Sequence, residues 1–473
     1  MQQKYFGTDG IRGRSNISVI TPETMIRLAM ATSVACNFMQ KKTSKPTVVI
    51  GKDTRLSGYM LEFALTSGFI SMGVNVVLVG PMPTPAISML VQSLRADLGI
   101  MISASHNPYY DNGVKFFNSW GYKISSKLEN KIEQLMLNDL SEYLAHYNNI
   151  GKAVKLEDAK GRYIEHIKYS FPHTHKLDGI KIVVDCANGA AYDVAPKVFH
   201  ELGAEVITCA VSPNGFNIND KCGVLDSNML SSMVVQYKAD LGIALDGDAD
   251  RVLIIDENGQ PIDGDQVIAS LASYLSQIDY GLTSNSVVTT IMSNMGLDLY
   301  LQKIGVNLVR TNVGDKYVVQ KMRELGCNLG GEQSGHIIIG SDQGTGDGIK
   351  AALQVLAMYK IAQNIPISKL LNKYQNIPQF TTNIHYDHKY YGKNLLCQDK
   401  VENIMKLYQE RYAKEARIIL RKSGTEPIIR LMVESTNETL AKEILKNIQI
   451  EVEKSFNSFI SPVAKEEILL VIV

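Results

Sequence analysis

Two hydrophobic periods alternate along the first two thirds of the chain and predict a repeated unit of strand, helix and strand. Residues 47–50 form a short apolar run typical of a buried strand, residues 57–72 follow the spacing of an amphipathic helix, and residues 73–77 begin the next strand. The junction of helix and strand recurs at residues 202–207 and 304–309, each time as a hydrophobic residue, a glycine and an alternating strand. Because glycine adopts the left-handed backbone conformation at no steric cost, it ends helices readily, and we expect a helix to end at each junction.

An identical pentapeptide, Ala-Asp-Leu-Gly-Ile, occurs at residues 96–100 and again at residues 239–243. Each copy comes after a βαβ pattern and leads into a polar loop. This equivalent placement favours a repeated structural unit over coincidence. The sequence therefore predicts an α/β fold with three related domains.

The chain of 473 residues is too long for one hydrophobic core and should divide into three or four domains. Turn-forming residues predict domains at 1–150, 151–256, 257–366 and 367–473. The last segment has a different pattern, in which strands alternate with two long helical stretches without the earlier repeat. This pattern indicates a smaller α+β domain.

Charge and cysteine content exclude several classes of protein. The chain has 48 basic and 48 acidic residues, so it lacks the basic surplus expected of a protein that binds nucleic acid or an anionic membrane. Six cysteines occur without a Cys-x-x-Cys pair, which argues against zinc and against a disulfide framework and indicates a reducing compartment, the cytoplasm. No window approaches the roughly 18 apolar residues that a membrane span needs.

The first pentapeptide continues as a buried strand to residue 102 and ends in the polar loop Ser-Ala-Ser-His-Asn-Pro, which contains Ser105 and His106. Ligands of open α/β sheets bind where strands end, so both side chains are candidates for chemistry; a turn in which Ser105 bonds to its own backbone is the alternative. Lys115 follows beside two phenylalanines. Partial desolvation there would lower the pKa of its ammonium group toward that of a working acid or base, whereas an isolated lysine is more often a solvated surface charge.

The second pentapeptide leads into the run Asp-Gly-Asp-Ala-Asp-Arg. Carboxylates at alternate positions of an extended turn point to one side, and crowded hard oxygens select a hard cation, so we predict an Mg²⁺ site at Asp246, Asp248 and Asp250. Calcium in an EF-hand loop is a weaker alternative, because Arg251 stands where that loop needs glycine and a strand-like run follows. A solvated acidic turn is the third interpretation.

The run Arg-Lys-Ser-Gly-Thr-Glu-Pro near the C-terminus predicts a phosphate-binding loop. Backbone N–H groups beside a glycine, hydroxyl groups and guanidinium groups are the donors that suit an oxyanion. The loop lacks the glycine spacing of a Walker A motif, and a turn with surface charges is the alternative. The candidate residues are Arg421, Ser423, Gly424, Thr425 and Arg430.

Two further glycine-rich segments carry candidate residues. One turn combines the carboxylate of Glu332, the hydroxyl of Ser334 and the imidazole of His336, which suits the vicinal hydroxyls of a sugar. A bulged hairpin with a structural histidine is the alternative for this turn. The segment near the N-terminus is a weaker signal and contributes one useful cation, Arg12.

Taken in order, the loops Ser-Ala-Ser-His-Asn-Pro, Asp-Gly-Asp-Ala-Asp-Arg, Gly-Glu-Gln-Ser-Gly-His and Arg-Lys-Ser-Gly-Thr-Glu-Pro resemble the four signature loops of the α-D-phosphohexomutase superfamily. With the opening Gly-Thr-Asp-Gly-Ile-Arg-Gly and the segment Tyr-Tyr-Asp-Asn-Gly, the resemblance is closest to its amino-sugar branch. It covers the chain through about residue 434. It implies three α/β domains with mixed sheets and a smaller α+β fourth domain around a central cleft.

The resemblance also implies a reaction. Phosphorylated Ser105 would give its phosphoryl group to glucosamine 6-phosphate, the bisphosphate would reorient, and its other phosphate would return to the serine and leave glucosamine 1-phosphate, for amino-sugar nucleotide and cell-wall precursor synthesis. Glucosamine 1,6-bisphosphate or a related bisphosphate would be intermediate and primer. One Mg²⁺ would bind Ser105 and the three aspartates. The partner would be a small sugar phosphate, and a homodimer is one oligomeric state that stays open.

The resemblance assigns further roles to the candidate residues. Lys115, with His336 second, would transfer the proton at the sugar hydroxyl beside Ser105 and His106, and Arg12 and Arg251 would steady the transferring group. The sugar would be held by Thr311, Gly314, Glu332 and Ser334, and the phosphate that does not react by Arg421, Ser423, Gly424, Thr425 and Arg430.

The chain departs from the superfamily pattern at Ala249, Asn312 and Lys422, where members commonly have glycine, a basic residue and proline. These departures affect affinity more than reaction class, since none deletes a proposed catalytic group. The alternatives are a phosphomannomutase or phosphoglucomutase, a sugar-phosphate sensor without turnover, and a metal-dependent phosphatase.

Overall fold

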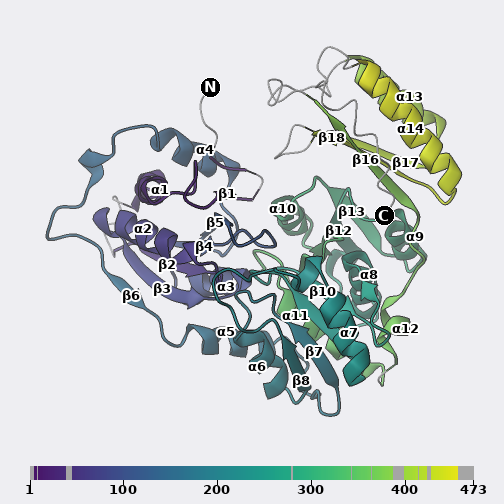
Figure 1. The fold of residues 1–473 in the computed structure, drawn as a ribbon, viewed down its shortest axis with the longest axis horizontal. Helices are drawn as coiled ribbons and strands as arrows, with labels where there is room; N and C mark the ends of the chain where they lie inside the picture. Colours follow the sequence, from purple (N-terminus) through teal and green to yellow (C-terminus); the bar gives the residue numbers. More distant parts are fainter. Residues whose placement is uncertain are drawn as a thin grey trace. The chain divides into compact units, whose positions relative to one another are not determined.

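The computed structural model describes residues 5–7, 9–38, 45–278, 281–341, 343–363, 365–386, 399–413, 415–422 and 428–455. The chain divides into two compact units (Figure 1). The first unit consists of Met1–Ser293 and Leu301–Lys373, and the second of Asn294–Tyr300 and Tyr374–Val473. Three sheets lie in the described part of the first unit and one lies in that of the second.

The first sheet is built from β1 (Ile11–Arg14), β2 (Thr47–Lys52), β3 (Asn75–Pro81), β4 (Leu98–Ile102), β5 (Asp111–Asn118) and β6 (Ala153–Lys155). Its order is β1-β5-β4-β2-β3-β6, and it is mixed, because β1 and β5 run antiparallel to their neighbours while the other strands are parallel. The helices of this region are α1 (Pro22–Ala35), α2 (Ser57–Ser71), α3 (Thr84–Ser93) and α4 (Ser126–Leu135).

Helices cover both faces of this sheet (Figure 1). Ile50 of β2 belongs to the hydrophobic core that contains Leu65 of α2. The next residue, Gly51, faces the other way, where a methyl group in place of its hydrogen would collide with Ile87 of α3. Because successive side chains of a strand point to opposite faces, α2 and α3 lie on opposite sides, as two right-handed crossovers in opposite directions require.

The helix predicted at residues 57–72 is confirmed as α2, but its predicted amphipathic character is wrong. Tyr59 and Phe63 are 53% and 65% exposed on its outer side, and the carboxylate of Glu62 is buried. Burial of this charge is tolerated because Glu62 forms an ion pair with Lys52 of β2.

The second sheet contains β7 (Lys181–Asp185), β8 (Glu205–Cys209), β9 (Leu241–Leu245), β10 (Val252–Ile255) and β11 (Pro261–Ile262), in the order β11-β10-β9-β7-β8. The third contains β12 (Ser286–Thr290), β13 (Asn307–Thr311), β14 (Leu329–Gly331) and β15 (Ile337–Ile339), in the order β13-β12-β14-β15. The accompanying helices are α5 (Ala159–Lys168), α6 (Val194–Glu201), α7 (Asn228–Tyr237), α8 (Gly264–Leu275), α10 (Asp315–Leu325), α11 (Gly348–Ile361) and α12 (Ile367–Leu371). Helix α9 (Met295–Lys303) begins in the second unit and ends in the first.

All three sheets of the first unit share one four-strand arrangement. The orders β5-β4-β2-β3, β10-β9-β7-β8 and β15-β14-β12-β13 are the same, with three parallel strands and one antiparallel strand in each. The prediction of three related α/β domains with mixed sheets is therefore confirmed. The hairpin between the third and fourth strands occupies the equivalent place in each domain.

The two pentapeptides are structural counterparts. Asp97 accepts a hydrogen bond from the N–H of Thr47 at 2.9 Å, and Asp240 accepts one from the N–H of Lys181 at 2.8 Å. In both domains the aspartate thus holds the first residue of the central parallel strand. The glycines at the three predicted helix-to-strand junctions, Gly73, Gly203 and Gly305, all have positive φ.

The described part of the second unit is a small α+β structure. Strands β16 (Gln379–His385), β17 (Arg417–Lys422) and β18 (Ile428–Glu434) form an antiparallel sheet in the order β16-β18-β17. Helices α13 (Asp399–Arg411) and α14 (Glu438–Ser455) lie side by side on it and share a hydrophobic core with its strands (Figure 1). The change of pattern that predicted a smaller α+β domain is confirmed.

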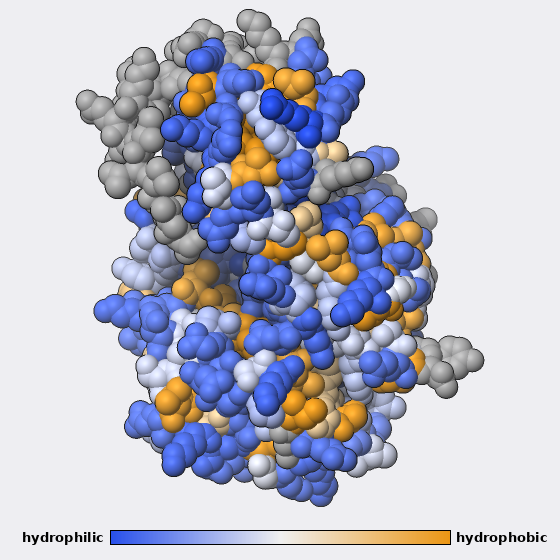
Figure 2. Space-filling model, turned by 90° about the vertical axis from the view of Figure 1, so that its right-hand side faces the viewer, coloured by the Kyte–Doolittle hydropathy of each residue, from blue (hydrophilic) through white to orange (hydrophobic). Residues whose placement is uncertain are grey.

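The exact domain boundaries stay predictions. Two short strands lie just after predicted boundaries but belong to the sheet of the preceding domain. Strand β6 joins the first sheet and β11 joins the second. No helix among the described residues is long and apolar enough to cross a membrane. On the face shown in Figure 2, hydrophobic side chains occur in small groups between hydrophilic ones.

Candidate active site

The three equivalent hairpin loops of the first unit carry candidate residues, and the loop of the aspartates contacts both of the others. Ser105 lies between β4 and β5, the aspartates lie between β9 and β10, and His336 lies between β14 and β15. Ser105 Oγ donates to Asp246 Oδ2 at 2.5 Å, and His336 Nδ1 lies 3.5 Å from Asp250 Oδ1. The repeat of the fold therefore brings a hydroxyl, a group of carboxylates and an imidazole to one place.

Ser105 is 1% exposed and has a φ of 53°, in the left-handed region that L-residues rarely adopt. Its N–H donates to Ser103 Oγ at 2.9 Å, and its own Oγ lies 3.3 Å from His106 Nδ1. The predicted alternative, in which the Ser105 hydroxyl bonds to its own backbone, is not the arrangement seen. The hydroxyl points toward the carboxylate of Asp246 instead.

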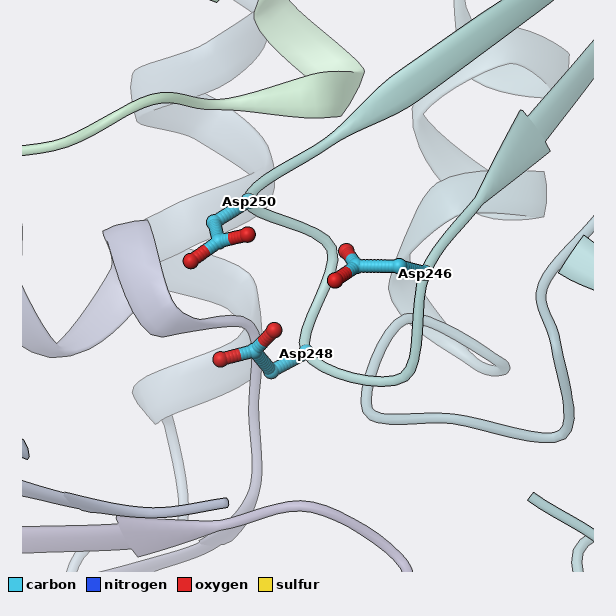
Figure 3. Close-up of side chains that lie close together, drawn as sticks. All are labelled: Asp246, Asp248 and Asp250. Atoms are coloured by element: carbon cyan, nitrogen blue, oxygen red, sulfur yellow. The ribbon is translucent and has the colours of Figure 1, made fainter. Parts of the chain in front are cut away.

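The carboxylates of Asp246, Asp248 and Asp250 face a common space, and an oxygen of each lies within 4.8 Å of the others (Figure 3). All three are buried, and Asp248 Oδ1 has no hydrogen-bond partner among the described residues. Burial, then Asp250 and Asp248, raise the pKa of Asp246 to about 8. Crowded carboxylates with an unpartnered oxygen suit a divalent cation, so the donor set fits Mg²⁺. The strand β10 directly after the loop excludes an EF-hand.

Lys115 lies on β5, and its ammonium group is buried among carboxylates. Nζ is 2.7 Å from Asp248 Oδ2 and 2.9 Å from Asp250 Oδ2, with Asp9 at 3.5 Å. The predicted lowering of its pKa is wrong. Burial does favour the neutral amine, but Asp248, Asp250 and Asp9 outweigh it and raise the pKa of Lys115 well above its ordinary value.

Arg251 connects the metal loop to the Ser105 loop. Its N–H donates to Asp246 Oδ1 at 3.2 Å, and its Nη1 lies 3.1 Å from His106 Nδ1. Since a guanidinium group can only donate, His106 Nδ1 accepts, and the imidazole is neutral in this arrangement. Burial, Arg251 and Arg12 lower the pKa of His106 to about 4.

Stability of the protein without a phosphoryl group is expected to fall between pH 6.5 and pH 4 because of His106. In this range the unfolded chain binds a proton that the folded imidazole does not, so acid favours unfolding, by about 3 kcal/mol at most for this shift. The free energy of unfolding in urea, measured for the wild type and for His106→Gln, tests this. Their difference should rise with pH up to about 6.5 and then level off; a constant difference would contradict the expectation.

Arg12 lies on β1 near this cluster, with Nη2 2.6 Å from Asp9. Sequence reasoning missed Asp9 and two further ionic groups, Lys123 and Asp315. Lys123 forms ion pairs with Asp9 and, at 2.5 Å, with Asp315, which begins α10 in the third domain. Burial by itself would raise the pKa of Asp9. The positive charges of Lys123, Lys115 and Arg12 outweigh burial and hold the pKa of Asp9 well below its usual value. No local sequence signal singles out Lys123 or Asp315, because their importance comes from burial between domains.

His336 is 3% exposed and contacts the second and third domains. Nε2 accepts the N–H of Gly346 at 2.8 Å and lies 3.4 Å from Asp315 Oδ2. Burial opposes protonation, but Asp250 and Asp315 raise the pKa of His336 above its ordinary value. The turn that carries His336 connects the hairpin β14–β15. This geometry is compatible with a sugar-binding turn and with a hairpin that holds a structural histidine, the two interpretations of the sequence.

The remaining candidates for holding the sugar lie around the same hairpin. Glu332 Oε1 accepts the N–H of Gly314 at 3.2 Å, and Ser334 Oγ, on an exposed residue, lies 3.4 Å from Glu332 Oε2. Thr311 ends β13 and is partly buried. The structure thus brings these four residues into one region of the third domain.

In the second unit, Arg421 of β17 stands directly opposite Arg430 of β18. Burial, then Arg430, lower the pKa of Arg421, and its Nε is buried without a hydrogen-bond partner among the described residues. Like charges opposite each other destabilise a sheet unless an anion compensates them. The predicted phosphate-binding residues Ser423, Gly424 and Thr425 lie outside the described residues.

Four family models for the phosphoglucomutase/phosphomannomutase domains match the chain in order. They describe α/β/α domain I at residues 3–142, domain II at 161–259, domain III at 263–377 and the C-terminal domain at 393–450. Together they span most of the chain, and each α/β/α model overlaps one of the three related sheets.

Known proteins agree with these matches. The phosphoglucosamine mutase of Parvibaculum lavamentivorans is 50% identical over 453 residues, which cover 96% of this chain and 99% of that protein. A phosphoglucomutase/phosphomannomutase family protein from Burkholderia thailandensis has the same fold, with a TM-score of 0.78, 22% identity and coverage of 96% and 97%. The N-acetylphosphoglucosamine mutase of Aspergillus fumigatus, solved with GlcNAc-6P and magnesium, gives a TM-score of 0.63 at 17% identity, covering 95% and 96%. The chain therefore belongs to the α-D-phosphohexomutase superfamily and, within it, to the family of the phosphoglucosamine mutases.

Proposed function

We propose that this chain interconverts glucosamine 6-phosphate and glucosamine 1-phosphate, with Ser105 as the carrier of the phosphoryl group. The observation that carries the mechanism is the 2.5 Å hydrogen bond from Ser105 Oγ to Asp246 within a buried group of three aspartates. A serine oxygen held against a carboxylate cluster is in place to share a divalent cation with it. The strong similarity to phosphoglucosamine mutases supports the choice of an amino sugar.

In each half of the reaction, the bond between phosphorus and one oxygen breaks while a bond to another oxygen forms. From phosphorylated Ser105 to the sugar, the hydroxyl of the sugar loses a proton and the serine oxygen gains one. Arg12 and Arg251, both close to the aspartates, are our candidates for binding the oxygens of the transferring group. A bound Mg²⁺ would supply charge neutralisation at that group.

Lys115 is the leading candidate for the proton exchange, and His336 is the second. Because the surrounding carboxylates raise its pKa, Lys115 carries its proton before transfer; it would give this proton to the serine oxygen as that oxygen leaves phosphorus, and would regain one from the sugar hydroxyl. His336 contacts Asp250 in the same cluster. His106 is neutral and accepts from Arg251, so we assign it to orienting that guanidinium group beside Ser105.

We assign binding of the sugar to the third domain and binding of the phosphate that does not react to the fourth. The link between Glu332 and Gly314 supports a shared site for the sugar at Thr311, Gly314, Glu332 and Ser334. The opposed guanidinium groups of Arg421 and Arg430 support an anion site that Ser423, Gly424 and Thr425 would complete. A bisphosphate would serve as intermediate and primer, whereas a homodimer stays a prediction.

A comparison of sugar phosphates tests the proposed reaction. Turnover of glucosamine 6-phosphate, mannose 6-phosphate and glucose 6-phosphate is measured in coupled assays, each with and without a bisphosphate primer. We expect the highest kcat/KM with glucosamine 6-phosphate and stimulation by the primer. A preference for mannose or glucose would contradict the amino-sugar assignment, steady release of inorganic phosphate would indicate a phosphatase, and binding without turnover would indicate a sensor.

A further inference from the structure

Arg55, in the turn after β2, is a fully buried arginine whose guanidinium group binds the Ser105 loop. Nε donates to the carboxylate of Asp53 at 2.8 Å. The other donors are directed at four backbone carbonyls of the loop, which belong to Ser105 at 2.9 Å, Asn107 at 2.8 Å, Pro108, and Asp111 at 3.1 Å. A guanidinium group has five N–H donors, and this arrangement uses all of them.

Asn219, from the second domain, binds two of the same carbonyls. Its Nδ2 donates to Ser105 O at 2.9 Å and to Asn107 O at 3.1 Å. Its backbone has a φ of 58°, and its N–H donates to Ala187 O at 2.9 Å, so the side chain is anchored to the domain that carries the aspartates. Ser105 O and Asn107 O therefore each accept from both the first domain and the second.

The contact between the two loops is tight at the same carbonyl. A methyl group on Gly247, between Asp246 and Asp248, would lie 2.5 Å from Ser105 O and 2.9 Å from Asn219 Nδ2. Only glycine leaves room for this approach. The position of the Ser105 carbonyl thus decides how the serine and the aspartate loop meet.

We propose that Arg55 and Asn219 are positioning residues for phosphoryl transfer, which together clamp the carbonyls of Ser105 and Asn107 from two domains. The strained backbone of Ser105 needs such support, because a residue in the left-handed region relaxes when its neighbours allow it. The clamp holds Ser105 Oγ within reach of Asp246 without touching the substrate. This inference rests on the proposed role of Ser105.

Asn219→Gly tests the clamp most cleanly, since glycine accepts the positive φ and the change removes only the amide. The matched control is Asn285→Gly, because Asn285 also has a positive φ, is exposed and donates to Gly305 O in the third domain. Single-turnover transfer from the phosphorylated protein to the sugar phosphate is expected to slow on the order of 10²-fold in Asn219→Gly. Affinity of the unphosphorylated protein for the sugar phosphate should stay within about threefold, as a positioning role requires.

Arg55→Lys is the second variant, with Arg417→Lys as its control, because Arg417 also forms an ion pair with a buried carboxylate, that of Glu434 in the second unit. Arg55→Lys keeps the charge beside Asp53 but loses most of the five hydrogen bonds. Because both residues hold the same carbonyls, the double variant with Asn219→Gly should be slowed by a factor that differs from the product of the single factors.

The outcomes separate two failures. If Ser105→Ala is inactive but Asn219→Gly transfers as fast as Asn285→Gly, the clamp is wrong and the proposed function stands. Equal effects on transfer and on sugar-phosphate affinity, or single factors that multiply, would also overturn it. If Ser105→Ala stays active, the proposed role of Ser105 itself fails.

Discussion

Ser105→Ala is expected to abolish turnover, lowering kcat by at least about 10⁴-fold, because alanine has no oxygen to carry the phosphoryl group that we assign to Ser105 Oγ. The change removes the hydrogen bond from Oγ to Asp246 but leaves the loop carbonyls bound to Arg55. The fold should therefore persist. Turnover is measured in the coupled assay, and intact-mass analysis should find one phosphoryl group in the wild type and none in the variant.

Ser33→Ala is the matched control for this substitution. Ser33 is buried in α1, and its hydroxyl donates to Ala29 O at 2.8 Å within the helix. It should leave both turnover and phosphorylation unchanged. Near-normal activity of Ser105→Ala, or a phosphoryl group that persists in it, would refute the phosphoserine mechanism.

Asp248→Asn is expected to lower kcat by about 10²-fold and to raise the Mg²⁺ concentration for half activity at least about tenfold, because one of three metal-binding charges is lost. Asp248 is suited to this test because Oδ1 has no partner among the described residues, while Oδ2 accepts from Thr84 Oγ1 and Lys115. A second readout is independent of activity. Mg²⁺ at a hundred times its Kd should raise the free energy of unfolding of the wild type by about 2.7 kcal/mol, and that of the variant by much less.

Asp158→Asn is the control, since it removes an equal charge from an exposed carboxylate that pairs with Arg162. Its Mg²⁺ response should match that of the wild type. An unchanged Mg²⁺ titration in Asp248→Asn would remove the metal assignment, whatever the loss of turnover.

Local patterns predicted the repeated fold well. The strand that ends at Ile102 and the glycine at each helix-to-strand junction are short-range features, and both appear as expected. The character of α2 was missed because the Lys52 partner that lets Glu62 be buried lies outside the helix. A periodicity argument weighs each side chain alone and does not see such pairs.

The site shows the same division. Ser105 and the three aspartates were found from their motifs, because each motif is continuous in sequence. The raised pKa of Lys115 was not predictable, since Asp9, Asp248 and Asp250, which cause it, each lie more than a hundred residues from Lys115 in the chain. Arg55 and Asn219 gave no signal either, because their role is to bind backbone carbonyls of another segment.

By itself, the sequence determined the three related α/β domains, the smaller fourth domain and the loops that carry a hydroxyl, carboxylates and an imidazole. Hydrophobic periodicity, turn-forming residues and contiguous motifs each depend on a few neighbouring residues, so they can be recognised in the sequence. Only the tertiary structure decided which loops meet, which charges are buried together and hence which groups hold their protons. These properties depend on distance and desolvation between segments remote in the chain, and no local pattern encodes them.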